Sequence, residues 1–73
     1  MNKKELFWLG DIPSHCQVTQ MKITNEFVDG RTPDNSWALM HPQAHIFYGK
    51  GIGVGKGQRY KKRYDGKWAK VDG

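Results

Sequence analysis

Short apolar runs flank a polar stretch between residues 26 and 40. Asp29-Gly30 is a strong reversal signal, and the polar residues that follow it include a proline, which is typical of a loop. Beyond the loop, Trp37 and Leu39 fall on one face of an extended chain, because side chains alternate along a strand. The pattern therefore predicts two antiparallel strands within 26–40, joined by a long loop.

The first apolar cluster of the chain lies within residues 1–9 and favours one or two helical turns, which Gly10 ends. Two roles are open for Leu6, Phe7 and Trp8. Phe7 and Trp8 either close one side of a small core, or the three side chains form an apolar clip for a protein partner. We favour the core, because a chain this short has few aromatic side chains to spare.

Three further stretches carry weaker signals. Residues 18–23 are weakly strand-like, and 41–48 favour a short helix with Pro42 in its first turn and Gly49 at its end. In 49–57 glycine occupies every second position. This stretch is either a strand whose glycine face admits a flat ring or another backbone, or a flexible loop.

The C-terminal segment contains the clearest local signal. Two strand-like runs flank Asp65-Gly66, a pair that favours a two-residue hairpin turn. That register places Arg63 opposite Trp68, where a cation–π pair can form. One face of the hairpin then carries Arg59, Lys61, Arg63, Trp68 and Lys70. Together the elements predict a small α+β, mostly β fold of antiparallel strands with a C-terminal β-hairpin and one or two short helices.

The length of 73 residues allows one domain. We divide it into an N-terminal segment (1–15), a core (16–57) and a basic hairpin or tail (58–73). Cys16 is the only cysteine, which excludes an internal disulfide and fits a reducing cytoplasm. No apolar run is long enough to cross a bilayer, so we expect a cytoplasmic monomer with no membrane partner.

Charge is distributed unevenly along the chain. Residues 1–49 carry 4 basic and 5 acidic side chains, a net charge of −1, whereas 50–73 carry 8 and 2, a net charge of +6. Such a segment favours a polyanion or an acidic protein surface as its partner. The candidate binding residues are Lys50, Lys56, Arg59, Lys61, Arg63, Trp68 and Lys70.

No catalytic or cofactor motif is complete. The glycine spacing fits neither a dinucleotide loop nor a P-loop, and the neighbours His15 and Cys16 point apart on an extended chain. We therefore expect no enzyme activity and no cofactor. Cys16, His41 and His45 are possible zinc ligands, but a closed zinc site needs four ligands, and only half a site is present.

A series of short motifs resembles a family of small phage-encoded proteins built around a zinc ribbon. The motifs are Phe27-Val28-Asp29-Gly30-Arg31-Thr32, Trp37-Ala38-Leu39-Met40, Gly55-Lys56-Gly57-Gln58-Arg59-Tyr60 and Gly66-Lys67-Trp68. The resemblance covers roughly residues 16–73. It implies a zinc knuckle at residues 16 and 19 and another at 41 and 44. Because Thr19 and Ala44 occupy two of these positions, the chain resembles a degenerate, metal-free member.

The chain is also similar in size and character to small transcription regulators of lytic Xanthomonas phages. That similarity implies host RNA polymerase as the partner, contact with nascent RNA, and inhibition or antitermination of transcription. The alternative is a stand-alone nucleic-acid-binding module, whose basic side chains follow phosphates while an aromatic ring stacks on a base.

Overall fold

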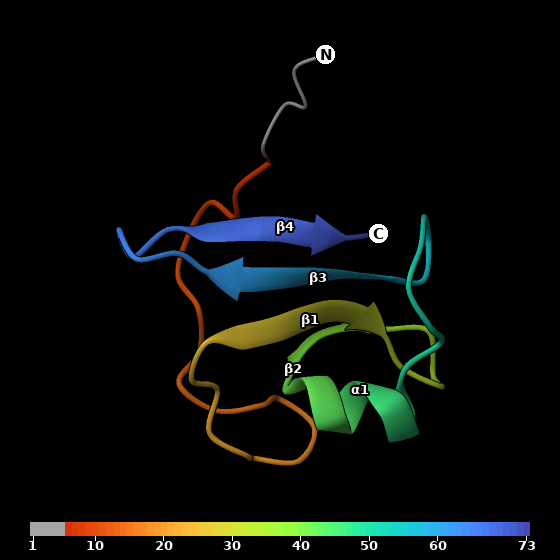
Figure 1. Ribbon diagram of the computed structural model, residues 1–73. Coiled ribbons are helices and arrows are strands. Elements are labelled where there is room, and N and C mark those ends of the chain that lie inside the picture. The colour runs from red at the N-terminus through yellow and green to blue at the C-terminus, as the bar shows by residue number, and fades with distance from the viewer. Residues whose placement is uncertain (1–5) are drawn as a thin grey trace.

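The computed structural model describes residues 6–73 and forms one antiparallel sheet with one short helix in that range (Figure 1). The elements are β1 (Glu26–Arg31), β2 (Trp37–Met40), α1 (Pro42–Tyr48), β3 (Gly57–Lys62) and β4 (Trp68–Asp72). The strand order is β2-β1-β3-β4. The predicted mostly β fold is confirmed. No helix in the described range is long and apolar enough to cross a membrane.

The predicted strand pair within 26–40 is confirmed as β1 and β2. The reversal comes later than predicted, because Asp29 and Gly30 continue β1. The turn is closed instead by Asp34, whose carboxylate accepts hydrogen bonds from the hydroxyls of Thr32 (2.5 Å) and Ser36 (2.6 Å). Hydrogen bonds from Ser36 and Thr32 lower the pKa of Asp34 to about 2.

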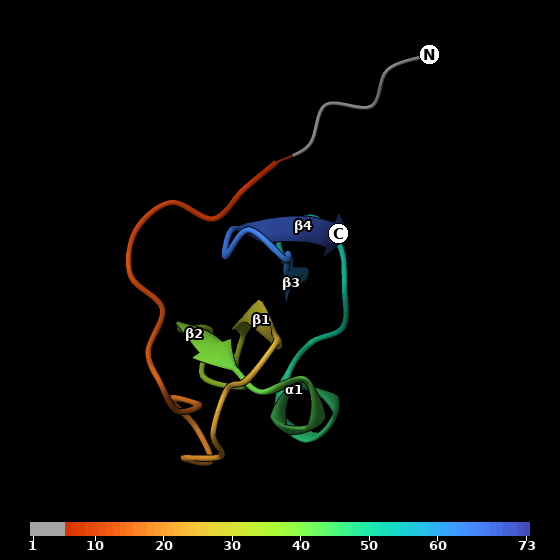
Figure 2. The ribbon, with the colours of Figure 1, turned by 60° about the vertical axis from the view of Figure 1, so that its left-hand side comes forward.

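Helix α1 follows the predicted range, with Pro42 in its first turn. The side chain of His41 caps it, because Nδ1 accepts a hydrogen bond from the Gln43 backbone at 3.0 Å. The helix packs against β1 and β2. We call the covered side of the sheet the helix face, which carries Val28, Gly30, Met40 and Arg59 by register. Figure 2 shows the N-terminal segment passing the sheet on the opposite side from α1.

The imidazole of His45 packs on glycines of the sheet. Gly30 and Gly57 are direct partners in the β1–β3 ladder. A Cβ atom on Gly30 would lie 2.8 Å from the His45 ring, and one on Gly57 would lie 3.0 Å from His45 Nε2. Gly49, just after the helix, touches the same ring. Because these residues lack a side chain, the imidazole fits directly against the backbone.

The opposite side of the sheet, which we call the aromatic face, carries Phe27, Tyr60 and Trp68 by register. Phe27 is fully buried. Its ring stacks on Tyr60 at 5.1 Å between centroids and meets Trp68 at 5.1 Å and Trp8 at 5.5 Å edge-on. Trp8 belongs to the N-terminal arm, residues 6–12, and brings that arm onto this face. The preference for a core role is thus confirmed for Trp8.

Two further sequence predictions are wrong. Residues 6–9 are not helical, because Trp8 N donates to Trp68 O and Lys70 N donates to Leu6 O, which aligns the arm with β4; residues 1–5 lie outside the described part. The stretch 18–23 contains an isolated bridge at Lys22 but no strand. Of the two alternatives for the glycine stretch before β3, the loop is confirmed, since Gly51, Gly53 and Gly55 have positive φ values that break an extended strand.

The glycine–imidazole packing predicts a specific coupling. Gly30→Ala is expected to reduce the free energy of unfolding by about 1–3 kcal/mol, because the new methyl group overpacks the site. In a His45→Ala background the same substitution is expected to cost less, since two of the three nearest atoms belong to His45. Urea denaturation of the four proteins of this double-mutant cycle measures the coupling. An equal cost in both backgrounds would show that the ring does not limit the space at Gly30.

Candidate polyanion-binding hairpin

The C-terminal hairpin has a different turn from the predicted one. Arg63 N donates to Lys67 O at 2.7 Å, and Gly66 N donates to Arg63 O at 3.0 Å, so three residues form the loop. A two-residue type I′ turn needs positive φ at both Asp65 and Gly66, yet only Gly66 has it, at +87°. Asp65 instead uses its carboxylate to accept a hydrogen bond from Lys67 N at 3.0 Å.

The extra loop residue shifts the register by one. Lys62 pairs with Trp68, and Tyr60 pairs with Lys70. A one-residue shift moves every side chain of one strand to the other face relative to its partner. The predicted face that grouped Trp68 and Lys70 with Arg63 is therefore wrong.

The observed register sorts the hairpin cations into two groups. Lys62 and Lys70 lie on the aromatic face together with Trp68. The other group lies on the helix face, and we call it the basic row: Arg59, Lys61, Arg63 and Lys67. Lys62 and Lys67 were absent from the predicted binding set. The three-residue loop puts Lys62 beside Trp68 and Lys67 in the basic row.

Most of the basic row is open to solvent because α1 covers β1 and β2. Lys61 and Lys67 are exposed, and the side chain of Arg63 keeps 30% of its surface accessible. Arg59 differs, since it is half-buried and its Nε is buried without a hydrogen-bond partner. Lys61, Arg63 and Lys67 are therefore the members that a macromolecule can reach directly.

Acidic side chains neutralise the hairpin only in part. Residues 59–72 contain 6 basic and 2 acidic side chains, and no Asp or Glu occurs between Asp34 and Asp65. Asp65 lies 3.5 Å from Arg63 Nη2, and the ladders place Glu26 opposite Lys61 and Asp72 opposite Arg59. With 6 basic and 2 acidic side chains, residues 59–72 have a net charge of +4, so the hairpin keeps a positive potential.

Cations of both groups lie over aromatic rings. The guanidinium of Arg63 is 5.4 Å from the Phe7 ring centroid, and Lys67 Nζ is 5.6 Å from the same ring. On the other face, Lys62 Nζ is 5.9 Å from Trp68. The predicted Arg63–Trp68 pair does not form: Arg63 lies over Phe7, and Lys62 lies over Trp68. Phe7 is half-buried beside the basic row and Leu6 is 53% exposed, so these two arm residues remain accessible to a partner.

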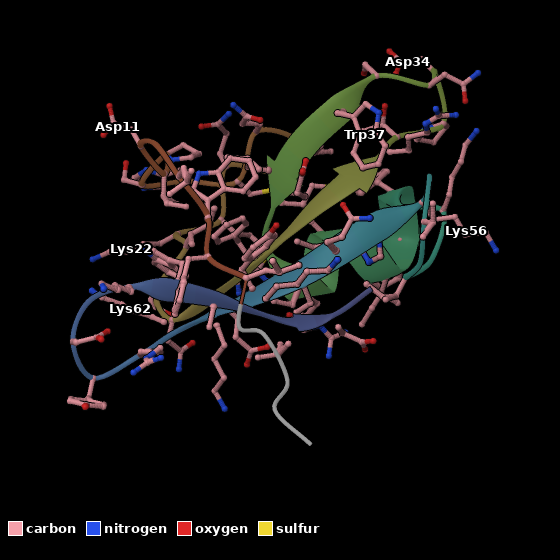
Figure 3. The ribbon with its side chains drawn as sticks, turned by 90° about the horizontal axis from the view of Figure 1, so that it is seen from above. Asp11, Lys22, Asp34, Trp37, Lys56 and Lys62 are labelled. Carbon is pink, nitrogen blue, oxygen red and sulfur yellow. The ribbon has the colours of Figure 1, made fainter. Side chains whose placement is uncertain are left out.

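Lys50 and Lys56 do not join the hairpin. Lys50 Nζ donates to Asn35 Oδ1 at 2.5 Å, beside the β1–β2 loop. Lys56 and Lys62 lie toward opposite ends of the sheet (Figure 3). The structure therefore separates these two lysines from the rest of the predicted binding set.

The possible zinc ligands are also separated. Cys16 is buried in a cluster with Met40 and Ala44, and its Sγ accepts hydrogen bonds from the Val18 and Thr19 backbone at 3.4 Å. Burial raises the pKa of this thiol, but the hydrogen bonds outweigh burial and lower the pKa overall. In residues 6–73 no three His, Cys, Asp or Glu side chains gather in a way that would hold a metal ion.

Comparisons with protein-family models, with curated proteins and with solved structures return no match for this chain. The functional inference therefore depends on the residues of the hairpin and on their surroundings.

Removal of metal is expected to leave the fold intact. Cys16 already has an apolar environment and two backbone donors, so no ion is needed to satisfy it. Amide NMR spectra with and without a strong chelator are expected to coincide, and added Zn²⁺ is expected to leave the melting temperature unchanged. Loss of the dispersed spectrum on chelation would contradict this expectation.

Stability is expected to fall as the pH drops below the ordinary His pKa of 6.5. Burial and the Arg59 charge lower the pKa of His45 in the folded chain, against an opposing hydrogen bond with Gly51. As the pH falls through 6.5 toward that lowered value, the unfolded chain binds the proton first, which favours unfolding. Urea denaturation between about pH 7.5 and 5 measures the loss. His45→Gln should flatten this dependence, whereas His15→Gln, at an exposed position, should retain it.

Proposed function

We propose that the protein is a non-enzymatic binding module that engages a polyanionic surface through its basic hairpin. The observation that carries the proposal is the basic row, in which Lys61, Arg63 and Lys67 share the part of the helix face that α1 leaves uncovered. Such a group attracts an acidic partner from solution and orients it during encounter. Exposed cations in a marginal 73-residue domain contribute little to its stability, which is consistent with a role in binding.

Host RNA polymerase, together with its emerging transcript, is the partner that the phage resemblance supports. An enzyme surface that holds RNA combines acidic protein and phosphate, and both attract the same cations. The protein then acts as a regulator of initiation and termination. Stand-alone nucleic-acid binding is the second candidate, favoured by the contacts of Arg63 and Lys67 with the Phe7 ring, because cations beside aromatic rings suit nucleic acids.

Two paired charge reversals test whether one face of the hairpin binds the partner. Lys61→Glu with Lys67→Glu alters the basic row, and Lys62→Glu with Lys70→Glu alters the aromatic face by the same charge. Each pair includes one lysine that lies over an aromatic ring. We expect the first pair to weaken binding by about tenfold and the second pair to weaken it much less, because only the first faces the partner.

Binding of both variants to purified bacterial RNA polymerase and to a 12-nucleotide RNA is measured by biolayer interferometry, with NMR confirming the fold. Equal losses for the two pairs would mean that net charge alone drives association. Unchanged binding by both folded variants would exclude the hairpin as the binding surface. The salt dependence of each affinity separates the two candidates, since lone RNA binding weakens steeply with salt.

A further inference from the structure

A pocket opens where the N-terminal arm passes the hairpin turn. Its volume is about 500 Å³, within the usual range for small-ligand sites of roughly 300–1,000 Å³. The lining residues are Phe7, Trp8, Leu9, Gly10, Asp11, Ile12, Gly66, Lys67 and Trp68. Lys67 also belongs to the basic row, so the pocket adjoins the proposed binding surface.

The walls of the pocket are held by the fold itself. Trp8 N donates to Trp68 O at 2.9 Å, which fixes the arm beside β4. The Trp8 ring is further held edge-on against Phe27 and Tyr60, each at 5.5 Å between centroids. The indole nitrogen of Trp8 donates to Asp11 O at 3.4 Å and closes the arm on itself. The pocket therefore exists before any ligand arrives, which lowers the entropic cost of binding.

The lining combines flat rings with positive charge. Three of the lining residues are aromatic: Phe7 lies on the side of the basic row, and Trp8 and Trp68 pack on the aromatic face. Leu9, also in the lining, is 87% exposed. Lys67 lines the pocket, and Arg63 lies over Phe7 at its edge. Aromatic walls beside cations suit a ligand that has a flat ring with a negative charge attached. A nucleotide is such a ligand, because its base stacks and its phosphate attracts cations.

Asp11, the single carboxylate that lines the pocket, determines how a bound nucleotide would be oriented. Asp11 lies on the arm and repels phosphate, whereas Lys67 comes from the hairpin and attracts it. Asp11 and Lys62 both lie toward the hairpin-turn end of the sheet (Figure 3). Phosphates are therefore expected along the basic row, with the base directed toward the arm.

We propose that this pocket receives one unpaired nucleobase of a single-stranded nucleic acid whose phosphates lie along the basic row. The inference rests on the proposed polyanion binding and names its ligand class. A duplex does not present an unstacked base, so the pocket gives a preference for single strands. An acidic peptide would be attracted by the same cations, and it is included among the test ligands.

The ligand test compares a 12-nucleotide oligothymidylate with an abasic strand of the same length, with a duplex, with thymidine monophosphate and with polyglutamate. Binding is measured by fluorescence of Trp8 and Trp68 in a Trp37→Phe background. Trp37 is 44% exposed on β2 and does not line the pocket, so its removal leaves the two pocket indoles unchanged. We expect the base-containing strand to bind at least about tenfold tighter than the abasic strand and to quench this fluorescence.

A matched pair of variants at Phe7 tests whether its ring stacks on the base. Phe7→Ala is expected to weaken oligothymidylate binding by about five- to tenfold, because one stacking surface is lost. Phe7→Tyr keeps the ring and should retain the affinity. Both variants are also measured with the abasic strand, and the loss caused by Phe7→Ala is expected to be larger for oligothymidylate than for the abasic strand, because only the former has a base to stack. Circular dichroism confirms that both variants fold.

The outcomes separate the two proposals. Equal affinity for abasic and base-containing strands, or for polyglutamate and oligothymidylate, would overturn the nucleobase pocket and leave polyanion binding standing. Absence of binding to every polyanion would overturn both proposals. Binding of thymidine monophosphate as tightly as the strand would assign the pocket to free nucleotides and overturn the single-strand proposal.

Discussion

The arrangement of the molecule depends on the packing around Phe27. This ring is fully buried on a central strand, and rings from three other segments surround it. A four-stranded sheet has two faces to cover, and a seven-residue helix covers only one. The arm must therefore cover part of the other, which it does by placing Trp8 against Phe27. That contact, together with the backbone hydrogen bonds between the arm and β4, holds the arm in place and forms the pocket.

On the helix face, α1 covers the sheet through close packing on glycines, which have no side chains to fill the space. His45 inserts its ring against paired glycines, so that α1 contacts the sheet without large side chains between them. The small cluster of Cys16, Met40 and Ala44 fills the remaining space. Because the helix is short and placed over β1 and β2, the helix face near the hairpin turn stays open to solvent, and Lys61 and Lys67 are exposed there. The short helix over β1 and β2 thus explains both the small core on this face and the accessibility of the basic row.

The sequence predicted those elements whose signals are local. The strands β1 and β2, the helix with Pro42 and the C-terminal hairpin follow from alternation and turn residues within a few positions. The arm was missed because its extended form depends on β4, about 60 residues away, rather than on its own pattern. The clustering of positive charge was visible, but its division between two faces was not. Asp65-Gly66 is compatible with a two-residue and with a three-residue loop. The difference of one residue in loop length decides which cations are neighbours.

Packing of the rings on the aromatic face favours the three-residue loop and its register. The core therefore determines which cations share the binding surface. With the observed register, Tyr60 and Trp68 both meet Phe27. The alternative register would turn Trp68 away from Phe27 and bring Lys67 or Ala69 toward that side, which gives up buried aromatic contact. The side chains between the aromatic positions must then face the other way, and on β3 these are cations. The basic row is thus a consequence of where the rings pack, so a change that loosens the rings also disperses the charge.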